Sequence, residues 1–190
     1  MLLRLKVIFI IIFLLLQAVI APAQTGVFEV VKSKTSFTSE APSELINASS
    51  AGLKGVIDPS KKTFLFKIPI ASFRGFNTPI QQEHFNENYM ESGHYPQAEF
   101  KGKIIEDIDL FREGSYTIRA KGSMTIHGVE QPCIIRVTMR VKKKDIIVSS
   151  SFPVALADYN IKIPRIVNDK LNPQILVNVD ATLSYKASRL

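Results

Sequence analysis

Cysteine is almost absent from this chain of 190 residues, in which Cys133 is the only one. A single cysteine cannot close an internal disulfide, and it cannot by itself provide a nucleophilic or metal-binding site built from cysteines. The residues in phase with it along the sequence are apolar. We therefore interpret Cys133 as a small buried hydrophobic residue and not as a reactive thiol.

Motifs of the common enzyme classes are also missing. The three histidines, His84, His94 and His127, show neither i, i+4 spacing nor a His-Glu-x-x-His motif. There is no Gly-x-Ser-x-Gly elbow, no glycine-rich phosphate loop and no evident acid pair. The sequence predicts a protein that is not an enzyme, with no catalytic residues, no metal site and no cofactor. One alternative stays open, a metal-dependent hydrolase in which the three histidines converge in space.

Long apolar runs are confined to the N-terminus. Residues 7–16 are unbroken in apolar character, two basic residues precede them, and Ala21-Pro22-Ala23 follows. This order is typical of a secretory signal peptide, whereas a spanning helix needs about 20 apolar residues. We predict a signal peptide over residues 1–23, export to the periplasm, and a single mature domain over residues 24–190.

Positive charge is modest once this segment is removed. Without Arg4 and Lys6, the formal charge of +7 falls to +5. The densest cluster is Arg140 with Lys142, Lys143 and Lys144, which could form a patch for nucleic acid or an anionic membrane. We favour a solvated hairpin turn there, and we expect no nucleic-acid partner for an exported protein.

Alternation of apolar and polar residues dominates the predicted mature chain. Residues 116–126 place Tyr116, Ile118 and Ala120 in one phase and polar residues in the other, and residues 133–141 and 175–185 repeat the pattern. A period of two is typical of strands with one buried face. We predict about eight strands, the remaining ones over residues 27–32, 53–57, 63–70, 98–108 and 146–152.

Short turn motifs between several of these strands favour antiparallel hairpins. Strands with one apolar face must hide that face, and a closed barrel does so while removing exposed sheet edges. The predicted fold is therefore all-β, an extended antiparallel eight-stranded β-barrel. One short helical excursion is predicted after Thr78-Pro79, over residues 81–90, ending at Gly93.

The interior of such a barrel can be filled by side chains or can hold one small ligand. Large inward residues such as Phe100 stand beside small ones such as Gly102. Alternation alone does not separate a hollow binding barrel from a filled one that acts as a structural or partner-binding envelope protein.

Three sequence blocks resemble the YceI-like family of exported, lipid- or polyisoprenoid-binding barrels. Residues 122–137, Gly-Ser-Met-Thr-Ile-His-Gly-Val-Glu-Gln-Pro-Cys-Ile-Ile-Arg-Val, resemble the family's strand, His-Gly turn and return strand. Residues 84–100 resemble the segment that leads through a Tyr-Pro pair into a strand. The third block is Asp158-Tyr-Asn-Ile161 with Asn168-Asp-Lys170. The blocks follow the expected order over most of the predicted mature chain.

The resemblance implies a lipocalin-like barrel with a long isoprenoid or similar amphiphile in its bore. The ligand is then the expected partner, and transient membrane contact is compatible with it. We expect His84, Arg74 and Arg165 to contact a polar head group at the mouth, since arginine matches phosphate geometry. The tail is expected to lie against inward-facing side chains: Phe64, Phe66, Phe100, Tyr116, Ile118, Met124, Ile135, Val137, Met139 and Val177.

Overall fold

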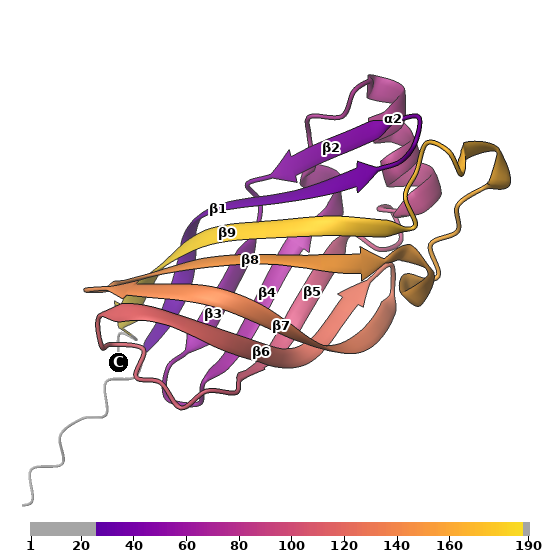
Figure 1. Cartoon of the computed structure of the whole chain (residues 1–190). Coiled ribbons are helices and arrows are strands. Elements are labelled where there is room, and N and C mark those ends of the chain that lie inside the picture. The colour runs from indigo at the N-terminus through magenta and orange to yellow at the C-terminus, as the bar shows by residue number, and fades with distance from the viewer. Residues whose placement is uncertain (1–25, 188–190) are drawn as a thin grey trace, which may run out of the picture.

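The structure, a computed structural model, describes residues 26–187, and the predicted signal peptide lies outside the described residues. Antiparallel strands curl around a common interior (Figure 1). In chain order the strands are β1 (Gly26–Glu40), β2 (Leu45–Ser50), β3 (Lys54–Asp58), β4 (Thr63–Pro69), β5 (Gln97–Ile104), β6 (Gly114–Ile126), β7 (Val129–Lys142), β8 (Asp145–Ala155) and β9 (Gln174–Ala187).

Strand β1 closes the barrel. It pairs with β9 along most of its length, from Gly26 opposite Ala187 to Thr38 opposite Leu176. On its other edge its first half pairs with β3, and β3 to β9 follow one another in order. The predicted antiparallel barrel of eight strands is therefore confirmed, formed by β1 and β3 to β9.

The extra strand β2 was not predicted. It pairs with the second half of β1, from Thr35 opposite Ser50 to Glu40 opposite Leu45. The strand predicted over residues 27–32 accordingly continues to Glu40. Hydroxyl and amide side chains occupy much of this hairpin, so its alternation is not one of apolar against polar residues.

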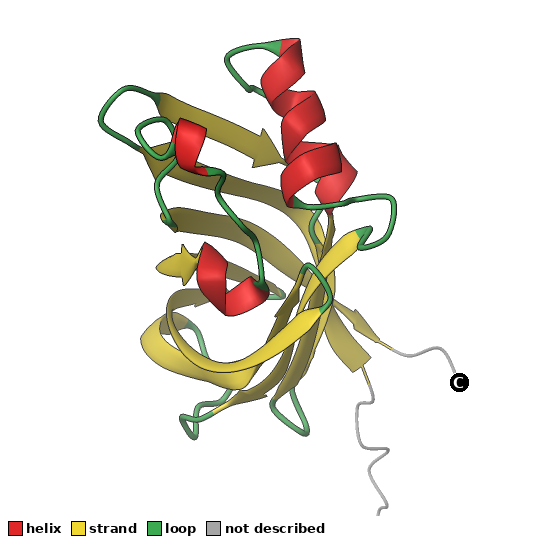
Figure 2. Cartoon of the chain, turned by 90° about the vertical axis from the view of Figure 1, so that its right-hand side faces the viewer, coloured by secondary structure: helices red, strands yellow, loops and turns green. Residues whose placement is uncertain are grey.

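Helical segments gather at one end of the barrel (Figure 2). The predicted helical excursion is confirmed as α2 (Pro79–His84), which continues into the π-helical η2 (Phe85–Tyr89). Thr78 caps α2, because its hydroxyl accepts a hydrogen bond of 3.2 Å from Gln81 N, and Pro79 fits the first helical position. Three 3₁₀ turns complete the set: η1 (Ile70–Ser72), η3 (Leu156–Tyr159) and η4 (Arg165–Val167).

A glycine pair bends the wall between β5 and β6. Gly102 and Gly122 lie directly opposite each other. A Cβ on Gly102 would collide with the carbonyl oxygen of Lys121, and one on Gly122 would collide with that of Lys101. Only glycine permits so close an approach of two backbones, so this pair lets the sheet curl tightly.

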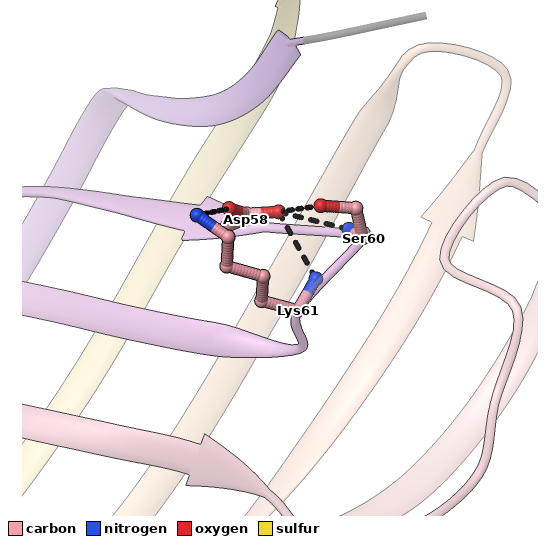
Figure 3. A network of polar contacts seen from close by, with 3 residues as sticks. All are labelled: Asp58, Ser60 and Lys61. Carbon is pink, nitrogen blue, oxygen red and sulfur yellow. Dashed lines mark hydrogen bonds and ion pairs between the residues drawn. The ribbon is translucent and has the colours of Figure 1, made fainter. Parts of the chain in front are cut away.

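Tight turns fix the strand registers. At the turn from β3 to β4, the Asp58 carboxylate accepts hydrogen bonds from Ser60 N (2.9 Å), Ser60 Oγ (2.6 Å) and Lys61 N (3.1 Å) (Figure 3). The Ser60 hydroxyl is the main reason that the pKa of Asp58 lies below its usual value. His127-Gly128, with φ of 51° and 73°, joins β6 to β7 as the two-residue type that suits a hairpin.

The lysine-rich segment lies where a hairpin turn was predicted. Lys142 pairs with Asp145 across β7 and β8, and Lys143 and Lys144 form the exposed turn between them.

Among residues 26–187, none of the helices has the length and apolar character needed to cross a membrane.

Candidate ligand cavity

The barrel encloses a cavity of about 510 Å³. Ligand cavities are typically about 300–1,000 Å³. Its wall is almost entirely apolar, and side chains from every barrel strand and from α2 and η2 contribute to it. The interior is therefore not filled by its own side chains, and the alternative of a solid barrel does not hold.

One end of the barrel is closed by packed side chains. Phe28, Ile146 and Leu183 are completely buried there. The ring of Phe28 lies 5.4 Å from that of Phe111 and 5.3 Å from that of Tyr185, measured between centroids. A ligand must therefore enter from the other end, where the helical segments lie.

Phenylalanine rings form the cavity wall at two levels. Deeper in, Phe64 and Phe100 have centroids 4.8 Å apart, and Phe66 lies over Gly55. Near the mouth, Phe85 of η2 stacks on Phe37 of β1 with centroids 5.3 Å apart and planes inclined by 18°. Phe73 and Phe76 complete this upper cluster. Aromatic contacts such as these stabilise the position of η2 over the opening.

Three elements form the mouth, and hydrogen bonds hold them together. The Gln81 side chain of α2 donates to the Glu44 carboxylate in the β1–β2 hairpin. The hairpin is tied in turn to the loop after η4, because Ser43 donates through N (2.8 Å) and Oγ (2.9 Å) to Asp169. Glu44, Gln81, His84 and Lys170 line the cavity at this rim.

Nine of the ten predicted tail contacts line the cavity, and Tyr116 does not. Tyr116 lies near the start of β6, packs against the buried side chains of the lower core, and donates its hydroxyl to the Arg112 carbonyl oxygen at 2.9 Å. Whether the nine residues contact a ligand remains a prediction. They are Phe64, Phe66, Phe100, Ile118, Met124, Ile135, Val137, Met139 and Val177.

Of the three predicted head-group contacts, only His84 lines the cavity. The Arg74 guanidinium donates to the carbonyl oxygens of Ala71 (2.6 Å) and Phe73 (2.7 Å), so it is turned onto its own loop. Arg165 is exposed on η4 and is not part of the lining. The cation that does line the rim is Lys170.

Several residues that line the cavity were not predicted from the sequence. Phe73 and Phe76 come from a loop, where no periodicity reports which side chains are buried. Phe37 follows a β-bulge, which shifts the inward phase of β1 between Val30 and Lys32. The spacing of Phe85 and Tyr89, four residues apart on one helical segment, was the available indication that η2 turns an aromatic face inward.

The histidines do not form a metal site. His84 lies at the mouth, and His94 is exposed in a turn. His127 lies in the β6–β7 turn, with Nδ1 3.1 Å from the Tyr159 carbonyl oxygen and Nε2 3.2 Å from the Glu91 carboxylate. Within the described part of the chain, no three His, Cys, Asp or Glu side chains are placed to hold a metal ion. The hypothesis that the three histidines converge on one metal ion is therefore wrong.

Three ionisable groups in or near the cavity wall have raised pKa values because they are poorly solvated. Desolvation raises the pKa of Tyr89, which lines the cavity, and that of the Cys133 thiol. The pKa of Tyr159 rises to about 12, again mainly through desolvation, with smaller contributions from Cys133 and Asp158. Each shift favours the neutral form of the group, the direction expected where burial removes water from around it.

Comparisons with known proteins agree with this architecture. A polyisoprenoid-binding domain from Saccharophagus degradans, implicated in plant cell wall breakdown, has a TM-score of 0.71 at 16% identity, over 85% of this chain and 98% of that one. Burkholderia cenocepacia BcnA has a TM-score of 0.66 at 16% identity, over 79% and 95%. The YceI protein of Campylobacter jejuni has a TM-score of 0.56 at 17% identity, over 75% and 85%.

At these identities, the solved structures show a shared fold. Comparison with curated protein sequences gives no match. The model of the YceI-like domain matches residues 17–183, which is most of the chain. The chain belongs to the YceI-like family.

Proposed function

We propose that this protein binds an apolar or amphiphilic lipid, isoprenoid-like in character, with the tail inside the barrel. The observation that carries the proposal is the apolar cavity of about 510 Å³, closed at one end by packed side chains and open toward the helical segments at the other. Membership of the YceI-like family and similarity to a polyisoprenoid-binding domain support an isoprenoid as the ligand class.

Burial of apolar surface supplies the binding free energy. A tail that loses about 300 Å² of accessible surface gains roughly 7 kcal/mol at 25 cal/mol per Å². Association and ordering consume part of this gain. A polar head group would remain at the rim, where Lys170 and His84 could contact an anionic group and Glu44 would disfavour one placed beside it.

We further propose a carrier or storage role in the periplasm without catalysis. At the rim, the Ser43 hydroxyl is hydrogen-bonded to the Asp169 carboxylate, but neither residue lines the cavity, so this pair is not placed to act on a bound molecule. The N-terminal residues that motivate export lie outside the described part of the chain. Secretion of the full-length chain, followed by N-terminal sequencing of the mature protein, tests the predicted start at Gln24.

Transient contact with an anionic lipid surface fits the mouth. Ile166 on η4 is 87% exposed, and Ile80 of α2 and Leu45 of β2 are 53% and 52% exposed around the same opening. Beside them Lys162 and Arg165 are exposed and form no ion pair within residues 26–187. Apolar side chains flanked by unpaired cations are typical of surfaces that dock on anionic membranes. Such docking would direct the mouth toward the bilayer from which a lipid is taken.

The decisive experiment is extraction of the mature protein after purification without detergent, followed by mass spectrometry of the organic phase. A stoichiometric amphiphile is the expected result. The delipidated protein should then bind a C20 isoprenoid alcohol with saturation at one equivalent. If nothing is extracted and no isoprenoid or fatty probe binds, the lipid-binding function is refuted.

A further inference from the structure

The cavity ends abruptly within the barrel. On β7 and β8, Met139 and Val148 lie opposite each other, and both line the cavity. One inward position further from the mouth, Val141 and Ile146 again lie opposite each other, but neither of them lines the cavity. The barrel therefore changes from hollow to filled within two residues of each strand.

The filled layer continues across the neighbouring strands. Ile146 lies opposite Leu183 of β9, and Leu183 lies opposite Val30 of β1. Val141, Ile146 and Leu183 are at most 1% exposed, and Val30 packs against the same core cluster. These four side chains, Val30, Val141, Ile146 and Leu183, form a continuous apolar layer that we call the cavity floor.

A loop supports the cavity floor on the side away from the cavity. Residues 105–113 join β5 to β6, and Leu110 within them is 2% exposed and belongs to the same core cluster. The ring of Phe111 packs against Phe28 and Tyr185, with centroids 5.4 Å and 5.1 Å away. A tail that reaches the cavity floor therefore meets packed core and not a second opening.

The depth of the cavity follows from the strands that line it. Lining residues on β8 run from Val154 near the mouth to Val148, a span of six residues, and those on β6 run from Ile126 to Ile118, a span of eight. At about 3.3 Å per residue these spans are roughly 20 and 26 Å long. Barrel strands are tilted by about 35–45° from the axis, so the cavity is about 15–20 Å deep.

This depth corresponds to a short isoprenoid chain. An extended isoprene unit advances by roughly 4–5 Å, because its four backbone carbons are joined by bonds of about 1.5 Å. We propose that the cavity floor sets the chain length of the bound lipid, and that this protein selects isoprenoids of three to four units, C15 to C20. The inference rests on the proposed lipid-binding function and specifies the length of its ligand.

The selection follows from where the carbons of a longer chain would lie. A chain that fits leaves the bilayer for another apolar environment, so its transfer exposes little apolar surface. A longer chain is stopped at the cavity floor, and its surplus carbons remain outside the mouth in contact with water. The free energy of that exposure rises with every added carbon.

The test equilibrates the delipidated protein with neutral phosphatidylcholine vesicles that contain equimolar all-trans prenols of 15, 20, 30 and 40 carbons. The protein is then separated from the vesicles, and the bound prenols are quantified by mass spectrometry. The C15 and C20 prenols should dominate. The C30 prenol should be bound at least about tenfold less than C20, because about ten of its carbons would be exposed to water.

Two variants move the cavity floor in opposite directions. Val148→Phe places a ring at the lowest level of the cavity, so the bound ratio of C20 to C15 should fall at least about threefold. Leu183→Ala removes three carbons from the cavity floor and should raise the bound ratio of C30 to C20. Ile147→Phe, on the exposed outer face of β8, is the matched control and should leave both ratios unchanged. Val148→Phe removes no carbon from the core, so it tests the cavity floor even if Leu183→Ala fails to fold.

The outcomes separate the length limit from lipid binding itself. Binding of C30 and C40 as strong as that of C20, or an unchanged ratio of C20 to C15 in Val148→Phe, would overturn the length limit and leave the lipid-binding proposal standing. If no prenol is bound and none displaces a fluorescent fatty probe from the delipidated protein, both proposals fail.

Discussion

A larger side chain in the cavity wall would occupy part of the enclosed space and so test directly whether this space is the binding site. Ala120 of β6 is 5% exposed and lines the cavity with a single methyl group. Leucine at this position adds three carbons that project into the bore. Because the space they enter is apolar and already enclosed, the added carbons should stabilise the delipidated protein while they compete with the ligand tail.

The magnitude follows from the burial of the added groups. Three methylene equivalents at about 0.8 kcal/mol each give roughly 2.4 kcal/mol. Fixing the leucine rotamer costs about 0.5–1 kcal/mol, which leaves a net stabilisation of about 1.5 kcal/mol. For a domain of this size each kcal/mol raises Tm by about 2–4 °C, so Ala120→Leu should raise it by about 3–6 °C. Affinity for an isoprenoid alcohol should fall at least about tenfold, because the tail loses the space that the leucine occupies.

The assay pairs thermal unfolding of the delipidated protein with probe displacement. Ala157→Leu adds the same three carbons on the exposed face of η3 and serves as the control, with no gain in Tm and no loss of affinity. Unchanged affinity in Ala120→Leu would show that the ligand lies elsewhere. A marked fall in Tm would show that the space around Ala120 is too small to accept a side chain.

Three further predictions concern the wall, the titrating groups and the mouth. Gly122→Ala should lower the free energy of unfolding in urea by more than about 2 kcal/mol, because the alanine Cβ would collide with the backbone of Lys101. A loss below about 0.5 kcal/mol would contradict the close approach of β5 and β6. The folded-state pKa of Tyr159, about 12, lies above its unfolded value of 10, so its contribution to stability is complete below pH 10 and is lost as the pH rises through 12. The unfolding free energy of Tyr159→Phe should fall less steeply than that of the wild type over this pH range, and parallel curves would contradict it. Ile166→Ser with Arg165→Gln should weaken cosedimentation with vesicles that contain anionic phospholipid, by about 1 kcal/mol for the lost cation, while vesicles of neutral lipid serve as the control. Undiminished binding by this double variant would exclude the mouth as the docking surface.

Most of the barrel strands could be predicted from the alternation of apolar and polar residues, because the burial of one strand face depends on residues close together in the sequence. Residues 116–126 carry their inward set, including Ile118 and Met124, in a strict period of two, and the structure places both in the cavity wall. The β1–β2 hairpin is different, since two of its inward residues, Thr35 and Ser39 on either side of Phe37, are polar. Hydropathy alone does not separate them from residues that face water, and this is the reason that the extra strand was missed.

Head-group contacts were harder to predict than tail contacts because they depend on loops. Arg74 and Arg165 have the right chemistry for an anionic group, but the first is held by carbonyl oxygens of its own loop and the second does not line the cavity. The position of Lys170 depends on hydrogen bonds between residues far apart in sequence, such as Ser43 with Asp169. No periodic pattern encodes contacts of this kind.

Whether the bore is hollow depends on how inward residues are distributed along the barrel axis, which alternation does not report. Phe28, Ile146 and Leu183 converge at one end and close it, while Ala120 and the phenylalanine pair Phe64 and Phe100 leave space above them. Concentrating large side chains at one end and in the wall leaves an enclosed apolar space. Such a space favours an apolar occupant over water, because water there would find few hydrogen-bond partners.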